Sequence, residues 1–359
     1  MMECATSGSA QDARADARVS VRPFESADQE RWDAFVERCP DATFCHRIGW
    51  REIIADEFRH RPHYLLAERN DAIVGVLPLA EVKSRMFGHA LVSLPFCVYG
   101  GPAANDGEAE RALIDESCKL AQALDVDHLE LRNRVAKHLE WPRQDLYVTF
   151  RKEILPDVAA NMLAIPRKQR AMVRKGIKHG LRSVIDDTVD RFFALYADNA
   201  HRHGTPPFSK QYFARLRAVF GDRCELLTVV DPQGEAVSSV LAFYFRDEVL
   251  PYYAGDSISA RDFAANDFKY WELLRRACER GLKVFDYGRS KLGTGSYDFK
   301  HNWGFVPAPL SYEYQLRKGE SIPQNNPLNP KYRTLIALWK RLPRVAVNAL
   351  GPHIVRGLG

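Results

Sequence analysis

The sequence predicts an α/β protein of the α+β kind, built as two similar lobes. At 359 residues, the chain is long enough for two domains of about 150 residues each. Both halves show the same order of elements, which is two helices, a strand hairpin, a further helix and a final strand. In each hairpin, alternating apolar residues flank a turn signal. This order therefore predicts an internal duplication of roughly 130 residues, with a mixed, mostly antiparallel sheet in each lobe.

The elements of each half follow from apolar spacing, which has a period of 3.6 residues in helices and two in strands. The first half predicts, in order, helices at about 27–38 and 49–57, strands at 63–67, 73–77 and 90–94, a helix at 107–124 and a strand at 128–132. The second half predicts helices at about 188–202 and 209–220, strands at 225–230, 236–246 and 248–254, a helix at 264–280 and a strand at 283–287.

These patterns divide the chain into four parts. We expect a disordered leader over 1–19, lobes over 20–150 and 151–316, and a basic amphipathic tail over 317–359. Two lobes that share a surface create a cleft, which is a favoured place for ligands.

Composition indicates an ordinary cytoplasmic protein, with 46% hydrophobic and 27% charged residues. No run of about 18 apolar residues predicts a membrane span, and the N-terminus has no apolar signal core. Seven cysteines without a CxxC pair fit a reducing compartment. The histidines have no partners at metal-ligand spacing, so we expect no metal.

Positive charge is concentrated in two stretches. Between residues 158 and 185 there are seven Lys or Arg and no acid. This run includes Arg167, Lys168, Arg170 and Arg174, and it is either a solvated helix face or a surface for an anionic partner. From 317 to 359 the chain carries a net charge of +7. The amphipathic part of that tail, from Tyr332 onwards, either lies on an anionic membrane surface or docks as terminal helices.

The most informative stretch is 285–314, where a strand-like run leads into a Gly- and Ser-rich loop bearing Arg289 and Lys291. Ligands of open α/β sheets bind outside the carboxyl ends of strands. A loop with Asp286, Arg289 and Lys291 at such an end is either a reaction site or a solvated connection.

The chain resembles the FemAB-type acyl- and peptidyltransferases, which are built from two acetyltransferase-like (GNAT) domains. The similar branch is the one associated with exosortase/PEP-CTERM and exopolysaccharide loci. The resemblance covers roughly residues 20–359, and the motifs that carry it are the basic run 167–180, Tyr252-Tyr253-Ala254-Gly255, 285–290, 299–305 and the tail segment 351–356.

The resemblance implies transfer of an acyl or aminoacyl group to an amine of a phosphate-bearing or lipid-linked saccharide or peptide precursor. Fem enzymes take the group from aminoacyl-tRNA and need no cofactor. Acyl-coenzyme A is the alternative donor, and acetyltransferases of this fold hold it through a Q/R-x-x-G-x-G/A loop that opens a helix. Segment 289–295 has one residue too many for that loop, and no helical pattern follows it.

Three residues at the second-lobe strand end are the leading candidates. Lys300 matches the lysine of the family's Phe-Lys motif, which implies oxyanion stabilisation or phosphate binding, and the alternative is a surface lysine. Asp286 either orients Arg289 or Lys300, accepts the proton of the amine, or caps the loop. Arg289 offers a fork for carboxylate or phosphate.

Further candidates come from both lobes. Tyr253 and Tyr297 supply hydroxyl donors or simply pack. Tyr99 opens a Gly-Gly-Pro segment that is similar to a Fem segment with a nearby aspartate, which makes Asp106 the candidate general base. Glu130 and Arg132 are the alternatives in this lobe.

Three functions remain open at this point. They are a Fem-type N-acyltransferase of envelope or exopolysaccharide assembly, an acyl-coenzyme A-dependent N-acyltransferase on an amino sugar, and a non-catalytic scaffold that binds an anionic glycolipid. The first would use a tRNA donor, and the tail would place it peripherally at the inner face of the membrane.

Overall fold

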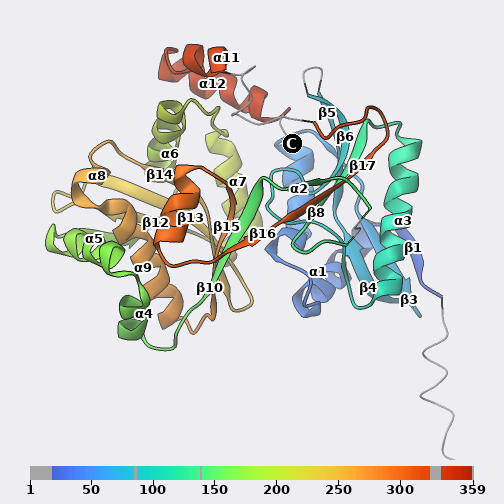
Figure 1. Cartoon of the computed structure of the whole chain (residues 1–359), viewed down its shortest axis with the longest axis horizontal. Helices are drawn as coiled ribbons and strands as arrows, with labels where there is room; N and C mark the ends of the chain where they lie inside the picture. The colour runs from blue at the N-terminus through green and yellow to red at the C-terminus, as the bar shows by residue number, and fades with distance from the viewer. Residues whose placement is uncertain (1–17, 85–86, 138–139, 324–332, 358–359) are drawn as a thin grey trace, which may run out of the picture.

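The computed structural model describes residues 18–84, 87–137, 140–323 and 333–357. In this part of the chain the strands form three sheets, arranged as two lobes that lie side by side (Figure 1). The predicted leader falls outside the described residues, except for Arg18 and Val19.

The first lobe holds two of these sheets, joined where one strand passes from the first to the second. Their strand orders are β1-β3-β4-β7 and β2-β5-β6-β8-β17-β9. Pro78 stands between β4 and β5, and its ring nitrogen cannot donate a ladder hydrogen bond. The strands contributed by the first half are β1 (Ser20–Pro23), β2 (Arg61–Pro62), β3 (Leu65–Arg69), β4 (Ala72–Leu77), β5 (Leu79–Ser84), β6 (Gly88–Ser93), β7 (Ala103–Ala104), β8 (His128–Asn133) and β9 (Arg143–Gln144).

The second lobe is built on one sheet with the order β11-β12-β13-β14-β15-β10-β16. It is antiparallel except where β14 and β15 run parallel, and that pairing joins only Glu248 and Val249 to Val284 and Phe285. Its strands are β10 (Tyr147–Glu153), β11 (Arg182–Ile185), β12 (Cys224–Val230), β13 (Ala236–Phe245), β14 (Glu248–Asp256), β15 (Val284–Lys291) and β16 (Pro307–Pro309).

The two lobes exchange one strand each. β10 follows the first-half elements in sequence but pairs with β15 of the second-lobe sheet. In return β17 (Ser311–Leu316), which follows the second-half elements, pairs with β8 of the first lobe. The seven-stranded sheet and the six-stranded sheet are therefore each completed by a strand that comes from the other half of the duplication.

Helices cover the sheets much as the apolar spacing predicts. In the first lobe these are α1 (Gln29–Arg38), α2 (Gly49–Asp56) and α3 (Gly107–Ala123), with α3 packed on β3 and β4. In the second lobe they are α4 (Val158–Ala164), α5 (Arg167–Lys178), α6 (Asp190–His203), α7 (Lys210–Phe220), α8 (Ala260–Phe263), α9 (Ala265–Glu279) and α10 (Gly295–Asn302). The tail forms α11 (Arg333–Trp339) and α12 (Arg344–Val355), and short 3-10 turns occur at η2 (Ser26–Asp28), η3 (Phe44–His46) and η4 (Gly221–Arg223).

Two expectations about the second-lobe strand end were wrong. Arg289 and Lys291 do not lie in a loop, because β15 continues to Lys291 and pairs Arg289 with Thr149 and Lys291 with Tyr147. A helix, α10, does follow this strand, and Thr294 caps it by accepting a hydrogen bond from the Tyr297 amide. A helix of eight residues has too few turns to show a clear apolar period in the sequence. The sequence feature that indicates α10 is its N-cap residue, Thr294.

One hydrophobic cluster runs across the junction of the lobes. The ring of Phe44 stacks on that of Phe243 at 4.3 Å between centroids, and Trp50 lies 5.2 Å from Phe220. Phe44 and Trp50 belong to the first half and the other two rings to the second, and all four are buried. Burial of aromatic rings on both sides favours a fixed arrangement of the lobes over a hinge.

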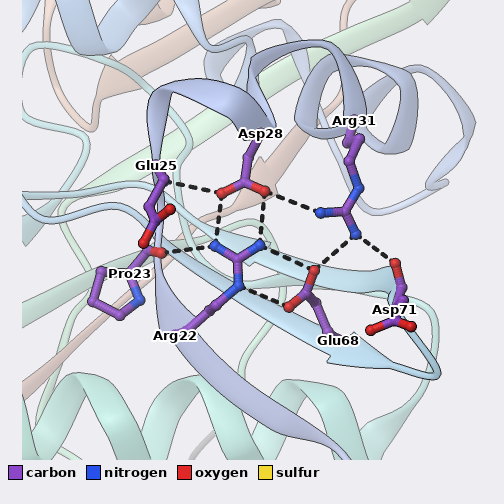
Figure 2. Close-up of polar contacts among 7 residues, drawn as sticks. All are labelled: Arg22, Pro23, Glu25, Asp28, Arg31, Glu68 and Asp71. Carbon is purple, nitrogen blue, oxygen red and sulfur yellow. Dashed lines mark hydrogen bonds and ion pairs between the residues drawn. The ribbon is translucent and has the colours of Figure 1, made fainter.

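A network of ion pairs joins neighbouring elements at the edge of the first lobe. Arg22 of β1 pairs with Asp28 of η2 at 2.7 Å and with Glu68 of β3 at 2.8 Å (Figure 2). Arg31 of α1 reaches the same two carboxylates (Figure 2). The hydrogen bond from Arg22 is the largest factor that lowers the pKa of Asp28 to about 2. The network therefore ties β1, β3 and α1 together.

Candidate active site at the junction of the lobes

Asp286 of β15 is the buried centre of a network that joins both halves of the chain. Its carboxylate accepts hydrogen bonds from the Tyr99 hydroxyl at 3.1 Å and the Gly288 amide at 2.7 Å, and it forms an ion pair with Arg151 of β10. The Tyr99 hydroxyl also lies 2.5 Å from the Thr149 hydroxyl. The Asp286 side chain is closed to solvent. These contacts favour its predicted role as a structural cap over that of a proton acceptor.

Arg151 holds this network from the second-lobe side. It also forms an ion pair with Glu248 at the start of β14. The strands β10, β14 and β15 are therefore joined by side chains at the place where β14 and β15 begin to separate. The carboxylates of Asp286 and Glu248 share the guanidinium of Arg151. Its positive charge offsets part of the free-energy cost of burying them.

Lys300 of α10 points its ammonium group back at the end of β15. Its Nζ donates to the carbonyl oxygens of Tyr287, Arg289 and Gly288 at 2.8, 3.1 and 3.3 Å. Gly288 has a φ of 62°, in the left-handed region that glycine adopts without strain, and this conformation turns the carbonyls of residues 287–289 toward one point. Lys300 is thus a brace between α10 and β15, as well as a positive charge.

Burial lowers the pKa of Lys300 to about 7, with the charge of Asp286 raising it and that of Arg289 lowering it further. An ammonium group can donate to three carbonyls, whereas a neutral amine can donate to only two. The three acceptors therefore hold the residue as a cation while burial opposes that charge.

Arg289 lies where the exchanged strands meet. Its guanidinium is 4.5 Å from the ring of Tyr147 on β10 and 5.6 Å from that of Tyr312 on β17. It also donates to the Tyr312 hydroxyl at 3.3 Å. The residue as a whole is exposed, and none of the carboxylates in the described residues forms an ion pair with its side chain. Arg289 is therefore a cation held against two aromatic rings, with no carboxylate partner in the described part of the chain.

A small pocket of about 60 Å³ lies on the first-lobe side of the same junction. Tyr99 lines it with its ring, beneath the guanidinium of Arg134 at 5.9 Å from the ring centroid. The other lining residues are Asp41, Thr43, His46, Gly100, Gly101, Pro102, Arg132, Asn133, Val135 and Lys137. Because the Tyr99 hydroxyl contacts Asp286, the pocket and the β15 end share one side chain.

The candidates of the first lobe have structural contacts that account for them. Asp106 is the N-cap of α3, where it accepts hydrogen bonds from the amides of Glu108 and Ala109. It also pairs with Arg69 at 2.8 Å, and that hydrogen bond is the main cause that lowers its pKa. Glu130 and Arg132 form a buried ion pair at 2.7 Å.

The two second-lobe tyrosines differ in their surroundings. The Tyr253 hydroxyl lies 2.8 Å from that of Tyr212, within a cluster of rings that includes Phe208 and Phe213. Tyr297 of α10 lies edge-on to Phe150 with 5.4 Å between centroids. Of the two, only Tyr297 is carried by the helix that also carries Lys300.

The basic residues of α5 are not gathered with Arg289. This helix packs on α9 through Val173 and Gly176, on the side of the second lobe that faces away from the first lobe (Figure 1). Arg167, Lys168 and Arg174 are exposed, and Arg170 donates to the Leu163 carbonyl at 3.0 Å. Ile177 is 50% exposed, and it is Gly176 that lies against Phe268 of α9.

Comparisons with known proteins agree with this architecture. Residues 167–301 match the family model described as an acetyltransferase (GNAT) domain. A curated relative from Weissella viridescens, UDP-N-acetylmuramoylpentapeptide-lysine N(6)-alanyltransferase, is 23% identical over 183 residues, which cover 49% of this chain and 53% of that protein. The chain thus spans about half the length of that curated relative.

Solved structures extend the likeness to both lobes. FemX matches with a TM-score of 0.64 at 16% identity, over 88% of this chain and 100% of its own. A tandem GNAT protein from the clavulanic acid biosynthesis pathway matches at 0.51 and 13% identity, over 85% and 100%. The chain has the tandem GNAT fold. Its similarity to FemAB-like peptidyltransferases rests on the alanyltransferase and FemX together.

L-PGS from Bacillus licheniformis shares the fold of this tandem GNAT protein, with a TM-score of 0.56 at 14% identity, over 88% of this chain and 96% of its own. The predicted fold class is therefore confirmed. In this fold the helix α10, which the sequence pattern missed, opens directly after segment 289–295. That removes one of the two objections to a phosphate-binding loop there, while its extra residue remains.

Sequence reasoning missed several residues of the tandem GNAT junction. Thr149 and Arg151 lie on β10, a strand that was not predicted, and Glu248 was not singled out. The alternation of Tyr147, Thr149 and Arg151 with Val148 and Phe150 was the signal for that strand. Among the described residues, no group of three or more His, Cys, Asp or Glu is placed to hold a metal ion.

Proposed function

We propose that this protein is a Fem-type N-acyltransferase, which transfers an acyl or aminoacyl group to an amine of a phosphate-bearing saccharide or peptide precursor. The observation that carries the proposal is the pair of cations at the end of β15, Arg289 and Lys300, at the junction of two GNAT-like lobes. The named activity of the Weissella relative, transfer of alanine to a lysine amine of a UDP-linked precursor, supports it.

The proposed reaction is aminolysis of an acyl ester or thioester. The amine nitrogen attacks the acyl carbonyl carbon, a tetrahedral oxyanion forms, and the bond to the donor oxygen or sulfur breaks. In our assignment the positive charge of Lys300 stabilises the oxyanion, and Arg289 binds a phosphate or carboxylate of a substrate. Tyr297 and the pocket beside Tyr99 help to orient the two substrates.

We assign no general base to Asp286 or Asp106. Asp286 is closed to solvent and fully engaged by Tyr99, Gly288 and Arg151, and Asp106 caps α3. The amine must then arrive neutral, and its proton passes to the departing oxygen or sulfur of the donor. This places the acid-base chemistry on the substrates and leaves the protein to position them and stabilise charge.

Aminoacyl-tRNA is the proposed donor, because Fem enzymes use it and because the alanyltransferase and FemX both support homology to those enzymes. The exposed cations of α5, which include Arg167, Lys168 and Arg174, would contact its phosphates together with Arg170. The acceptor would belong to exopolysaccharide or envelope assembly. The sequence motifs at 285–290, 299–305 and 351–356 favour the exosortase/PEP-CTERM-associated branch, and that assignment stays a prediction.

A donor screen tests the proposal. The purified protein is incubated with a phosphorylated amino-sugar or peptidoglycan precursor and either labelled aminoacyl-tRNA or labelled acyl-coenzyme A, and label in the precursor is measured. Transfer from aminoacyl-tRNA supports the proposal, and Arg289→Ala should raise the KM for one substrate by roughly tenfold or more, given the strength of charged hydrogen bonds.

Transfer from acyl-coenzyme A alone would favour the amino-sugar acyltransferase. If neither donor is consumed while the precursor still raises the melting temperature, the protein is a glycolipid-binding scaffold and the proposal is wrong.

A further inference from the structure

The two tail helices dock on both lobes instead of projecting into solvent. α12 packs on α6 of the second lobe, and a β-carbon at Gly351 would come within 2.5 Å of Pro207. Farther along, the Arg356 carbonyl accepts a hydrogen bond from His60 of the first lobe at 2.8 Å. Figure 1 shows α11 and α12 along one edge of the molecule, above α6. The tail is therefore held in one orientation.

α12 carries apolar side chains on its exposed side as well as on the side that the protein covers. Val347, Gly351 and Val355, spaced by four residues, form the buried face. On other sides of the helix Val345 is 82% and Leu350 50% exposed, and Ala349 is exposed as well. Leu338 of α11 adds a further side chain that is 59% exposed. Asn348 and His353 of α12 are exposed too, so polar side chains stand among the apolar ones on the uncovered side.

Positive charge accompanies these exposed apolar side chains. Lys340 and Arg341, in the short connection between the two helices, are exposed. The sequence contains no Asp or Glu after Glu320, so no acid of the tail offsets them. Arg344 is paired with Asp198 of α6 and holds the helix to the body. The uncovered surface thus combines large exposed apolar side chains with a basic border and two polar side chains, Asn348 and His353.

We propose that this surface, formed by Leu338, Lys340, Arg341, Val345, Ala349 and Leu350, lies on an anionic lipid bilayer. Basic side chains meet the negative headgroups, and the apolar side chains enter the boundary with the acyl chains. A second copy of the chain fits less well, because a symmetric contact would bring the same cations together. Peripheral binding needs no spanning helix, and the described residues contain none long and apolar enough to span a membrane.

Flotation with liposomes tests the proposal without relying on any catalytic activity. The full chain is mixed with phosphatidylcholine vesicles that contain either phosphatidylglycerol or no anionic lipid, at low and high salt. We expect it to float with the anionic vesicles only, and less at high salt because salt screens the attraction. Val345→Ser with Leu350→Ser should reduce the bound fraction about tenfold, since both side chains are exposed and the fold does not need them.

Charge variants give a second, independent measurement. Each basic residue near an anionic surface contributes about a factor of five to binding, so Lys340→Gln with Arg341→Gln should weaken it roughly 25-fold. The matched controls change equally exposed residues elsewhere, which are Ile258→Ser with Val306→Ser, and Lys119→Gln with Lys283→Gln. Melting temperatures confirm that every variant is folded.

Three results would overturn the proposal. The first is equal flotation of the protein with neutral and anionic vesicles. The second is loss of vesicle binding in the control variants at residues 258, 306, 119 and 283. The third is a dimer in light scattering that Val345→Ser with Leu350→Ser converts to a monomer, since the surface would then be an interface between copies of this chain.

Discussion

Lys300 combines a brace with a charge, and the two roles respond differently to substitution. Three backbone carbonyls accept hydrogen bonds from its ammonium, and burial lowers its pKa to about 7. A lysine is charged below its pKa, so the cation is lost as the pH rises through about 7. Any reaction step that needs the positive charge must therefore slow on the alkaline side.

We predict that kcat falls as the pH rises through about 7, because the charge that stabilises the oxyanion is lost there. Lys300→Ala should reduce kcat by roughly tenfold or more, because it removes the positive charge proposed to stabilise the oxyanion. A pH-rate profile with saturating substrates measures the first effect, and turnover measures the second. Lys119→Ala, an exposed lysine of α3, is the control. A folded Lys300→Ala variant with normal turnover would exclude the role.

At the scale of single elements, α3 shows how a plausible catalytic residue can be explained by its helix. Asp106 was predicted as a general base from its place after a Gly-Gly-Pro segment. In the structure its carboxylate receives the free amides at the start of α3 and the guanidinium of Arg69. The similarity of that segment to one of Fem enzymes made Asp106 a candidate, but its hydrogen bonds belong to the helix.

We predict that Asp106→Asn keeps turnover within about twofold, because asparagine caps a helix nearly as well as aspartate. Asp106→Ala should lower the free energy of unfolding by about 1 kcal/mol, since alanine cannot accept the amide hydrogens. Urea unfolding and the transfer assay measure the two effects separately. A drop in turnover of tenfold or more in a stable Asp106→Asn variant would restore Asp106 as a general base.

At the scale of the whole molecule, the exchange of β10 and β17 makes each lobe depend on the other half of the chain. The aromatic cluster around Phe44 and Phe243 adds a shared core, and the Tyr99–Asp286–Arg151 network adds buried polar contacts. Such lobes cannot separate without exposing both a sheet edge and buried rings. The predicted boundary at residue 150 and the division at 316 remain predictions about domains.

We predict that the two lobes unfold in one cooperative transition. Trp32 reports on the first lobe, and Trp271 and Trp303 report on the second, and all three are buried. Variants that keep tryptophans in one lobe only should show the same denaturant midpoint by fluorescence, equal to that from circular dichroism. Midpoints that differ between the lobes would show that the exchanged strands do not couple them.

The sequence by itself determined the local elements and the duplication. Apolar spacing placed the helix at 264–280 and the hairpin of the second lobe within a few residues of α9, β12 and β13, because period and turn chemistry are local properties. The motifs also led to the tandem GNAT fold, and they made Lys300 and Arg289 the charged residues of the proposed site, which stays a prediction.

Only the tertiary structure decided which strand completes which sheet and which side chains are already engaged. β10 and β17 pair with partners more than 130 residues away in sequence, and no local pattern encodes that choice. From the sequence, Asp286 was a candidate proton acceptor. In the fold its carboxylate is buried and engaged by Tyr99 and Arg151. The physical reason is that burial and hydrogen bonding are set by neighbours in space, which the order of residues does not reveal.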